Sequence, residues 1–291
     1  MIAAGNSGAA PPRGRRLNAL LAGLYRHSAS ALGTSIVVLF LTLALIGPLI
    51  APFGLNEQIA TDALAPPSGK HLFGTDLLGR DVFSRVILGA RQVLELAGTG
   101  TLIAVLLGTS IGLFSGYRGG WLDELVMRFF DSLLSLPALL LALLLLGTLG
   151  PSQRSVLVVI AVVYTPIVAR VVRSVALSVK TKGFIDAARL QGESLGRILF
   201  REIFPSALPT LAVEASLRFS YAIFLVASLG FLGIGVQPPS PDWGLMVKEA
   251  RAYVSQAPWA LYFPAGAIAM IVVGVNLMAD GLKRELQASR E

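Results

Sequence analysis

The residues best suited to chemistry are few in this sequence, and their types argue against catalysis. There is no cysteine and there are only two histidines, His27 and His71, so thiolate chemistry and cysteine-ligated metals are excluded. No Ser/His/Asp set, metal-ligand cluster or pair of carboxylates within an apolar segment can be assembled. The pair Gly69-Lys70 lacks the upstream glycine of a GxxxxGK[ST] nucleotide loop and is followed by His71. We therefore expect a protein that is not an enzyme and holds no cofactor or metal of its own.

One pair of opposite charges lies in an otherwise apolar segment. Glu214 and Arg218 are four residues apart, a spacing that allows an ion pair on one face of a helix. Ionisable residues inside apolar segments are candidates for function. A structural ion pair explains these two equally well.

Two further polar motifs lie in connections between apolar segments. The segment GTDLLGRD carries Asp76, Arg80 and Asp81, and Trp243 ends the proline-rich segment PPSPDW. Proline and glycine at these positions indicate turns. The four residues are candidates for binding a partner protein, or else for a structural cap over neighbouring helices.

A charged segment, GFIDAARLQGESLGRILFREIFPSALP, occupies residues 183–209 between long apolar stretches. Apolar and small residues recur in it at helical spacing, whereas Asp186 and Arg189 fall off that stripe. Gly192 and Gly196 interrupt the pattern, so two short helices with a glycine corner are expected. The helix could lie on lipid headgroups or dock a cytoplasmic partner. The stripe consists of Ile185, Ala188, Gly192, Leu195 and Leu199.

The rest of the chain is typical of an integral membrane protein. Of its 291 residues, 54% are hydrophobic and 14% charged, and the apolar residues come in blocks. Since only helices can cross a bilayer as separate segments, we expect an all-α protein with six spans. Residues 1–28 would be a basic tail, 29–285 the transmembrane domain, with a loop at 180–209, and 286–291 a second tail. The predicted spans lie at about 30–51, 94–116, 130–149, 155–173, 211–234 and 259–280.

The distribution of basic residues predicts the orientation. Most of the 24 lysines and arginines fall in the tails and in the connections after the second and fourth spans. Because cytoplasmic segments are enriched in lysine and arginine, both termini and the charged segment are expected in the cytoplasm. The net charge of +7 is then explained by topology and anionic headgroups, without nucleic acid as a partner.

The segment DAARLQGESLGRILFREIFPSALP resembles the cytoplasmic signature of binding-protein-dependent ABC importer permeases. That signature is Glu-Ala-Ala, three residues, Gly, and later a hydrophobic residue with Leu-Pro. Here Asp186-Ala187-Ala188 takes the first place, with aspartate for glutamate, Gly192 the glycine, and Ala207-Leu208-Pro209 the end. Segments such as HLFGTDLLGRDVFSRVILGAR and ASLGFLGIGVQPPSPDWGLMVKEAR look like the "C" subunits of the dipeptide/oligopeptide/nickel branch. The resemblance covers about residues 30–285.

This resemblance implies a type I permease fold with cytoplasmic coupling helices, in a bacterial plasma (inner) membrane. It also implies a homologous "B" permease, two cytoplasmic ATPases that carry ATP and Mg²⁺, and an extracytoplasmic substrate-binding protein. Residues 183–204 would couple the pore to an ATPase. In that role Asp186 and Arg189 make polar contacts, Ala187 and Ala188 pack, and Gly192 permits the bend, with Ile185 and Leu195 completing the surface. Peptides are the expected substrate. A nickel or small-solute importer, and then a secondary transporter or channel, are the alternatives.

Overall fold

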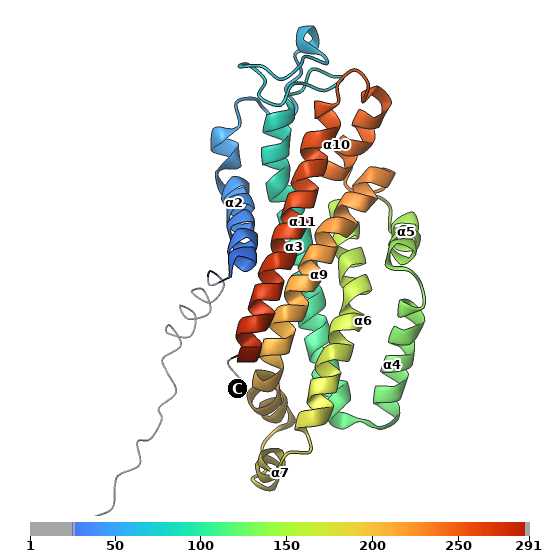
Figure 1. The fold of residues 1–291 in the computed structure, drawn as a ribbon. Helices are drawn as coiled ribbons and strands as arrows, with labels where there is room; N and C mark the ends of the chain where they lie inside the picture. The colour runs from blue at the N-terminus through green and yellow to red at the C-terminus, as the bar shows by residue number, and fades with distance from the viewer. Residues whose placement is uncertain (1–24, 26, 289–291) are drawn as a thin grey trace, which may run out of the picture.

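The computed structural model describes Tyr25 and residues 27–288, and this part is helical, with only an isolated bridge between Thr75 and Asp81 as β-structure. The predicted N-terminal tail and the end of the predicted C-terminal tail fall outside the described residues. Long helices run side by side in an elongated bundle, with shorter helices at both ends (Figure 1). The α-helices are α2 (Ser28–Ile50), α3 (Val82–Arg118), α4 (Gly120–Leu134), α5 (Ala138–Leu149), α6 (Gln153–Val179), α7 (Gly183–Leu190), α8 (Leu195–Arg197), α9 (Phe204–Leu232), α10 (Trp243–Ala250) and α11 (Trp259–Ala288).

Five helical stretches are long and apolar enough to cross a membrane. They are α2, α3, α6, α11 and the continuous stretch 195–232, in which a π-helical segment, Ile198–Ile203, joins α8 to α9. The pair α4 and α5 makes a sixth crossing if it is counted as one span. The expectation of an all-α protein with several apolar spans is confirmed.

The third span differs from the single straight helix predicted at 130–149. The structure has two helices there, α4 and α5, which are bent by 92° relative to each other. Pro137 lies at the bend and precedes the first residue of α5. Its ring lacks an N–H donor and disfavours helical geometry at Leu136, which favours a break at this point. Proline alone does not force one, because Pro166 and Pro264 lie inside the continuous helices α6 and α11. Apolar residues continue on both sides of Pro137, so hydrophobicity alone did not predict the break.

The first residues of two helices also differ from the predicted starts of the corresponding spans. Helix α3 begins at Val82 instead of near residue 94, because the Asp81 carboxylate accepts a hydrogen bond of 2.8 Å from the Ser84 N–H and caps the helix. Helix α9 begins at Phe204, which shortens the predicted loop 180–209. Charged ends of helices therefore project beyond the apolar runs.

Helices α3 and α6 pack at short distance along much of their length. A stripe of glycines on α3 makes this possible, because a Cβ at these positions would overlap α6. At Gly112, for example, an added Cβ would lie 2.4 Å from the carbonyl oxygen of Ala169. The stripe consists of Gly100, Gly108, Gly112 and Gly116.

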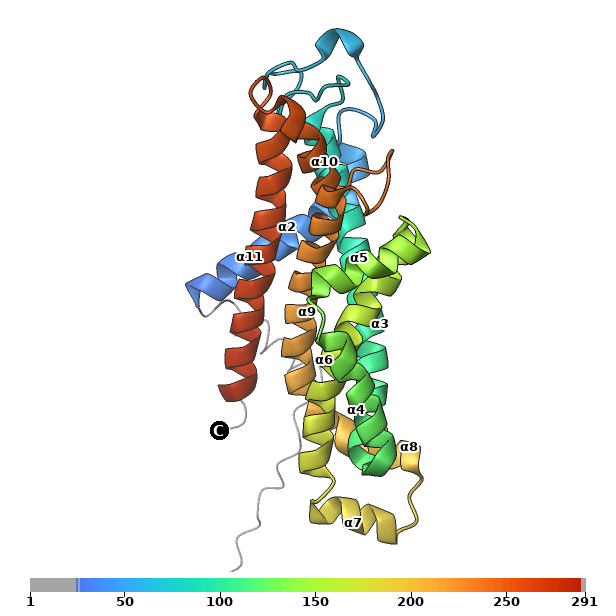
Figure 2. The ribbon, with the colours of Figure 1, turned by 90° about the vertical axis from the view of Figure 1, so that its right-hand side faces the viewer.

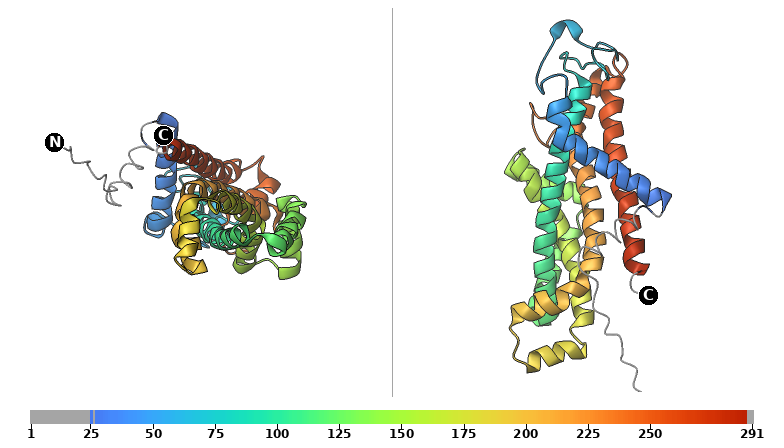
Figure 3. Two further views of the ribbon diagram at one scale, coloured as in Figure 1. Left: turned by 90° about the horizontal axis from the view of Figure 1, so that it is seen from below. Right: turned by 90° about the vertical axis from the view of Figure 1, so that its left-hand side faces the viewer.

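The bundle has two distinct ends and two distinct flanks. Helix α7 lies at one end, and the connection between α2 and α3 lies at the other, next to α10 (Figure 1). Helices α4 and α5 lie along one flank and α2 lies on the opposite flank (Figure 1). Seen from the side of α4 and α5, α2 passes behind the bundle (Figure 2). There α2 crosses the bundle obliquely (Figure 3). The charged segment therefore lies at the opposite end of the bundle from the polar motifs GTDLLGRD and PPSPDW.

Candidate functional site

The charged segment folds as predicted in its first half, a short helix followed by a corner at a glycine, whereas its second half, α8, continues through a π-helical segment into α9. Helix α7 ends at Leu190, and Gly192 follows with φ of +75°. This left-handed conformation strains residues that have a Cβ. No atom lies within 4 Å of a Cβ built on Gly192, so its backbone conformation is what calls for glycine there.

The apolar stripe of this segment faces the chain's own interior, which corrects part of the predicted contact surface. Ile185 is fully buried and Ala188 nearly so, in one cluster with Leu199 and the ends of α3 and α6 that lie next to α7. These side chains cannot touch another protein while they are packed there. The burial follows from amphipathicity, because the nearest apolar surface belongs to the same chain. Leu195, in contrast, is exposed beyond the corner.

The face of α7 that points outward carries both charged and apolar side chains. Asp186, Ala187 and Arg189 are exposed, and their contact with an ATPase stays a prediction. Two exposed residues were missed, Phe184 and Leu190, and the Leu190 side chain is 90% exposed. Both lie off the apolar stripe, and that position was the available signal. Phe184 and Leu190 add apolar area to the exposed face of α7 that carries Asp186.

Arg189 connects α7 to the end of α3. Its guanidinium Nε donates to the Tyr117 hydroxyl at 3.0 Å and lies over the Tyr117 ring, 5.0 Å from the centroid. The same guanidinium donates to the Asp186 carboxylate at 3.0 Å. Arg189 therefore holds α7 in place and is less free for contact with a partner than its charge suggests.

Helix α6, which leads into α7, is fastened to α3 and α4. Arg173 makes two hydrogen bonds of 2.6 Å to the Asp123 carboxylate, and Arg170 pairs with Asp131. The Lys180 ammonium donates to the Gly116 carbonyl at 2.9 Å. A displacement of α7 would thus be transmitted through α6 to both neighbouring helices.

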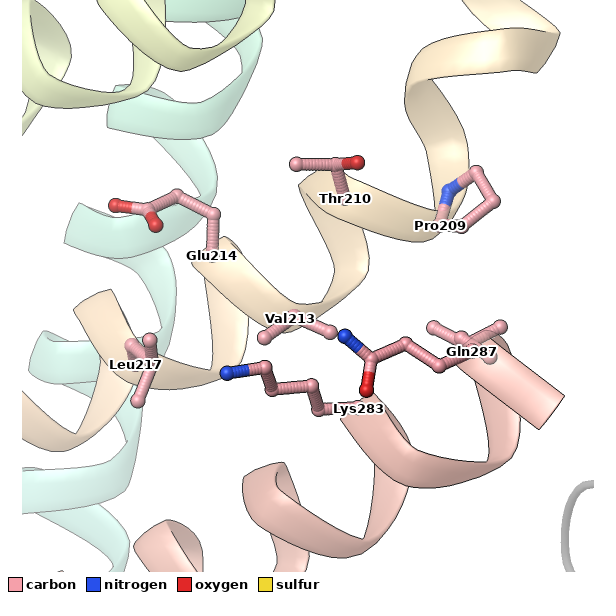
Figure 4. A pocket seen from close by; sticks show the side chains of 8 residues that line it. Pro209, Thr210, Val213, Glu214, Leu217, Lys283 and Gln287 are labelled. Atoms are coloured by element: carbon pink, nitrogen blue, oxygen red, sulfur yellow. The ribbon is translucent and has the colours of Figure 1, made fainter.

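The predicted ion pair within α9 forms. The Arg218 Nε lies 2.8 Å from the Glu214 Oε1, and the guanidinium also lies over the rings of Tyr221 and Tyr164. A cavity of about 310 Å³ separates this part of α9 from the end of α11. Figure 4 shows the Glu214 carboxylate turned away from Lys283 of α11. Glu214 and Arg218 therefore contact each other and the two tyrosine rings within the helix bundle.

The motif GTDLLGRD forms a buried charge network, in which Asp76 and Arg80 have their partners within the chain. Asp76 accepts from the Arg80 Nε at 2.6 Å and from Arg85 at 2.8 Å, and Arg80 also donates to Glu249 of α10 at 2.7 Å. Asp76, Arg80 and Arg85 are all less than a tenth exposed. Buried charges require such partners because desolvation is costly. The network links the connection after α2 to α10.

Asp81 and Trp243 are also internal, which corrects their predicted role at the surface. Asp81 caps α3 and lies 2.9 Å from the Nδ1 of His71, whose Nε2 lies 3.1 Å from Asp62. Lys70 and His71 lower the pKa of Asp62 to about 2. Trp243 is fully buried and donates its indole N–H to the Val86 carbonyl at 2.9 Å. Together these contacts form a structural cap, the alternative that the sequence left open.

Asp242 caps the start of α10 and lies close to Gly230 of α9. Its Oδ1 accepts from the Leu245 N–H at 2.8 Å, and a Cβ built on Gly230 would lie 2.0 Å from that oxygen. Burial raises the pKa of the Asp242 carboxyl to about 6. The close contact between the two helices therefore depends on a glycine in one and a buried acid at the start of the other.

Comparison with known proteins assigns this arrangement to a family. Residues 108–289 match the family described as "Binding-protein-dependent transport system inner membrane component". The chain belongs to this family. Residues 21–67 also match the N-terminal transmembrane domain of oligopeptide transport permease C. Both matches agree with the resemblance found in the sequence.

Individual relatives show which members of the family this chain is similar to. The dipeptide transport permease DppC of Alkalihalophilus pseudofirmus is 40% identical over 90% of this chain and 86% of its own length. The glutathione transport permease GsiD of Pectobacterium atrosepticum is 38% identical over 90% and 87%. Among solved structures, the MetNI methionine ABC transporter superposes with a TM-score of 0.56 at 19% identity, over 69% of this chain and 96% of the other. That similarity supports the fold alone.

Proposed function

We propose that this chain is one of two permease subunits of an ATP-driven peptide importer in a bacterial plasma membrane. It would cross the membrane six times with both termini in the cytoplasm, counting α4 and α5 as one broken span. Its peptide substrate is inferred from relatives whose names specify dipeptides and glutathione. A homologous permease supplies the other half of the pore, two cytoplasmic ATPases supply the energy, and an extracytoplasmic binding protein delivers the substrate.

The observation that carries this proposal is the exposed face of α7. Phe184 and Leu190 are large apolar side chains left in solvent, beside the exposed charge of Asp186. An apolar anchor surrounded by polar groups is the usual composition of a protein contact. Since α6 is fastened to α3 and α4, an ATPase that moves α7 would also move the spans around the pore.

The sister permease would cover an apolar groove on the opposite side from α2. The groove has a volume of about 640 Å³ and lies between α5, α9, α10 and α11. Its wall includes Phe224, Phe231 and Val272, and Phe224 is 60% exposed. A second chain that presented the same elements would bury this face and enclose a passage between the two subunits.

The binding protein would contact the outer cap through leucines, since the charged residues of the cap are internal. Leu72, Leu77 and Leu78 are each about half exposed on the connection that the buried charge network supports. A rigid support under exposed apolar side chains suits repeated docking. The network would transmit the docking event to α10 through Arg80 and Glu249.

Two matched substitutions test the proposed ATPase contact at α7 and the proposed binding-protein contact at the α2–α3 connection separately. Leu190→Asp is expected to abolish co-purification of the ATPases while the binding protein still associates. Leu77→Asp should leave the ATPases bound and remove the stimulation of ATP hydrolysis by the loaded binding protein. Each variant serves as the control for the other, because both place a charge on an exposed leucine. If Leu190→Asp retained the ATPases, α7 would not be their docking site.

Transport itself distinguishes this proposal from a channel or secondary carrier. Liposomes that contain only the purified chain should take up no dipeptide. Uptake is expected only when the sister permease, both ATPases, the binding protein and ATP are present. Uptake by the chain alone would reject the proposal.

A further inference from the structure

The ion pair on α9 lies at the depth of the hydrocarbon region of a membrane. The Arg218 guanidinium lies 5.8 Å from the ring centroid of Tyr164 on α6. The next residue of α6, Thr165, has its carbonyl oxygen 2.9 Å from a Cβ built on Gly108 of α3. Gly108 is near the middle of the uncharged run 96–117 of α3, which is long enough to cross about 30 Å of hydrocarbon.

Helix α11 indicates the same depth. The hydroxyl of Ser220, two residues after Arg218, donates to the Val272 carbonyl at 3.5 Å. Val272 lies within the uncharged run 252–279 of α11. Ionisable side chains at this depth are costly, and they commonly mark the path of a transported solute. The ion pair is therefore a candidate for contact with substrate.

The contact between Glu214 and Arg218 leaves part of the guanidinium unused. The Nε and Oε1 atoms are 2.8 Å apart, but both are buried and neither makes a hydrogen bond, so the N–H does not point at the carboxylate. The two terminal nitrogens of Arg218 are accessible, and no described residue accepts a hydrogen bond from them. The rings of Tyr164 and Tyr221 stabilise the cation without accepting these donors. Arg218 is thus positioned while its fork of donors remains free.

Arg218 adjoins the apolar groove between α5, α9, α10 and α11. Tyr221 lies one helical turn after Arg218 and one turn before Phe224, which lines that groove. The Tyr221 side chain is 51% exposed, and its ring centroid lies 4.8 Å from the Arg218 Cζ. The Arg218 side chain is itself 14% exposed. A solute in the proposed passage would therefore meet the guanidinium beside Tyr221.

We propose that Arg218 is a substrate contact inside the passage and binds the C-terminal carboxylate of a free peptide. A guanidinium and a carboxylate match in two parallel hydrogen bonds, and both are stronger where water is excluded. Glu214 balances the charge of Arg218 while the passage is empty. A lipid phosphate is a poor fit, because headgroups lie at the membrane surface. The inference rests on the proposed function, since it takes a peptide as the transported solute.

Uptake of dialanine by the complete transporter in liposomes tests this contact. The double variant Glu214→Gln with Arg218→Gln removes both charges, so no unpaired charge is left in the membrane. It should keep the sister permease and the wild-type melting temperature, and import dialanine about tenfold more slowly. Wild-type uptake in this variant would overturn the proposal. Loss of the sister permease would also overturn it, by assigning Arg218 to the contact between the subunits.

An exchange variant separates substrate binding from a structural ion pair. Glu214→Arg with Arg218→Glu rebuilds a pair at the same spacing but moves the cation one turn away from Tyr221. Uptake should stay about tenfold below the wild type, because the carboxylate would meet an acid. Full uptake would show that the pair is structural. Arg128→Gln is the matched control, since it breaks an exposed pair of the same spacing on α4, and it should leave uptake unchanged.

Dialanine amide, which lacks the carboxylate, identifies the group that Arg218 binds. The ratio of dialanine uptake to dialanine amide uptake should fall about tenfold from the wild type to the neutral double variant. The preference of the binding protein cancels in this comparison, because both transporters use the same binding protein. An unchanged ratio would overturn the carboxylate contact. Absence of dialanine uptake by the wild-type transporter would instead reject the proposed function, so the two failures are distinguishable.

Discussion

At the scale of single residues, Gly192 determines the direction of the chain between α7 and α8. Its φ of +75° disfavours any residue with a Cβ, by about 1–2 kcal/mol. Gly192→Val is therefore expected to shift α8 relative to α7 and to lower transport-coupled ATP hydrolysis severalfold. Gly196→Val is the matched control, since Gly196 has neither a positive φ nor a neighbour within 4 Å. Unchanged coupled hydrolysis in Gly192→Val would exclude the hinge role.

The buried carboxyl of Asp242 makes the stability of the folded chain depend on pH. Its pKa in the folded chain is about 6, above the value of about 3.9 expected when unfolded, so the folded state binds more protons between these values. The stability contributed by this group is therefore full below pH 4 and lost as pH rises to 6. Asp242→Asn keeps an oxygen acceptor for the Leu245 N–H but does not titrate.

The expected result is that the melting temperature of Asp242→Asn changes less between pH 4 and pH 7 than that of the wild type. Asp62→Asn is the negative control, because the pKa of Asp62 is lowered to about 2, so its stabilisation is lost only below pH 4. Identical pH profiles for the wild type and Asp242→Asn would show that Asp242 does not titrate in this range.

Residue types predicted the candidate site only in part. The positions of Asp186, Arg189 and Gly192 followed from spacing, and the Glu214–Arg218 pair followed from the four-residue rule. The roles of Asp76 and Arg80 could not be predicted in this way, because a sequence does not show which charges are buried. Asp76 finds its partners at Arg80 and Arg85, but the link from Arg80 to Glu249 spans 169 positions in the chain. Such long-range contacts are fixed by tertiary packing.

At the scale of helices, hydrophobicity located the spans but not their ends or breaks. The third span was predicted as one helix because leucines continue on both sides of Pro137, and the proline breaks it nonetheless. Capping by Asp81 likewise extends α3 beyond its apolar run. Local backbone chemistry decided these features, and both signals were present in the sequence.

The packing of α3 on α6 yields a sharp prediction. Gly112→Ala would bring a methyl group to 2.4 Å from the Ala169 carbonyl oxygen, so the helices must separate or shift. A loss of about 1–3 kcal/mol is expected, the typical cost of overpacking. Gly98→Ala on the same helix is the control, because its nearest neighbour, Phe219, would lie at 3.8 Å. A thermal melt should therefore separate the two variants, and equal melting temperatures would contradict the packing described here.

At the scale of the whole molecule, the proposed function depends on the two ends of the bundle facing opposite sides of the membrane. The chain has no native cysteine, so single engineered cysteines report topology without background. Gly69 lies in the outer connection and Gly196 in α8, and neither would bring a new side chain within 4 Å of another atom. Both positions are exposed, so a thiol there should react readily.

In intact cells, or in spheroplasts where an outer membrane is present, an impermeant maleimide should label Gly69→Cys and leave Gly196→Cys unlabelled. After permeabilisation both should react, which confirms that the second thiol is accessible. The reverse pattern would place α7 outside the cell, where no ATPase can reach it. It would also move the basic residues around α7 to the side of the membrane where they are least abundant. This one measurement therefore tests the orientation on which ATPase coupling and binding-protein docking both depend.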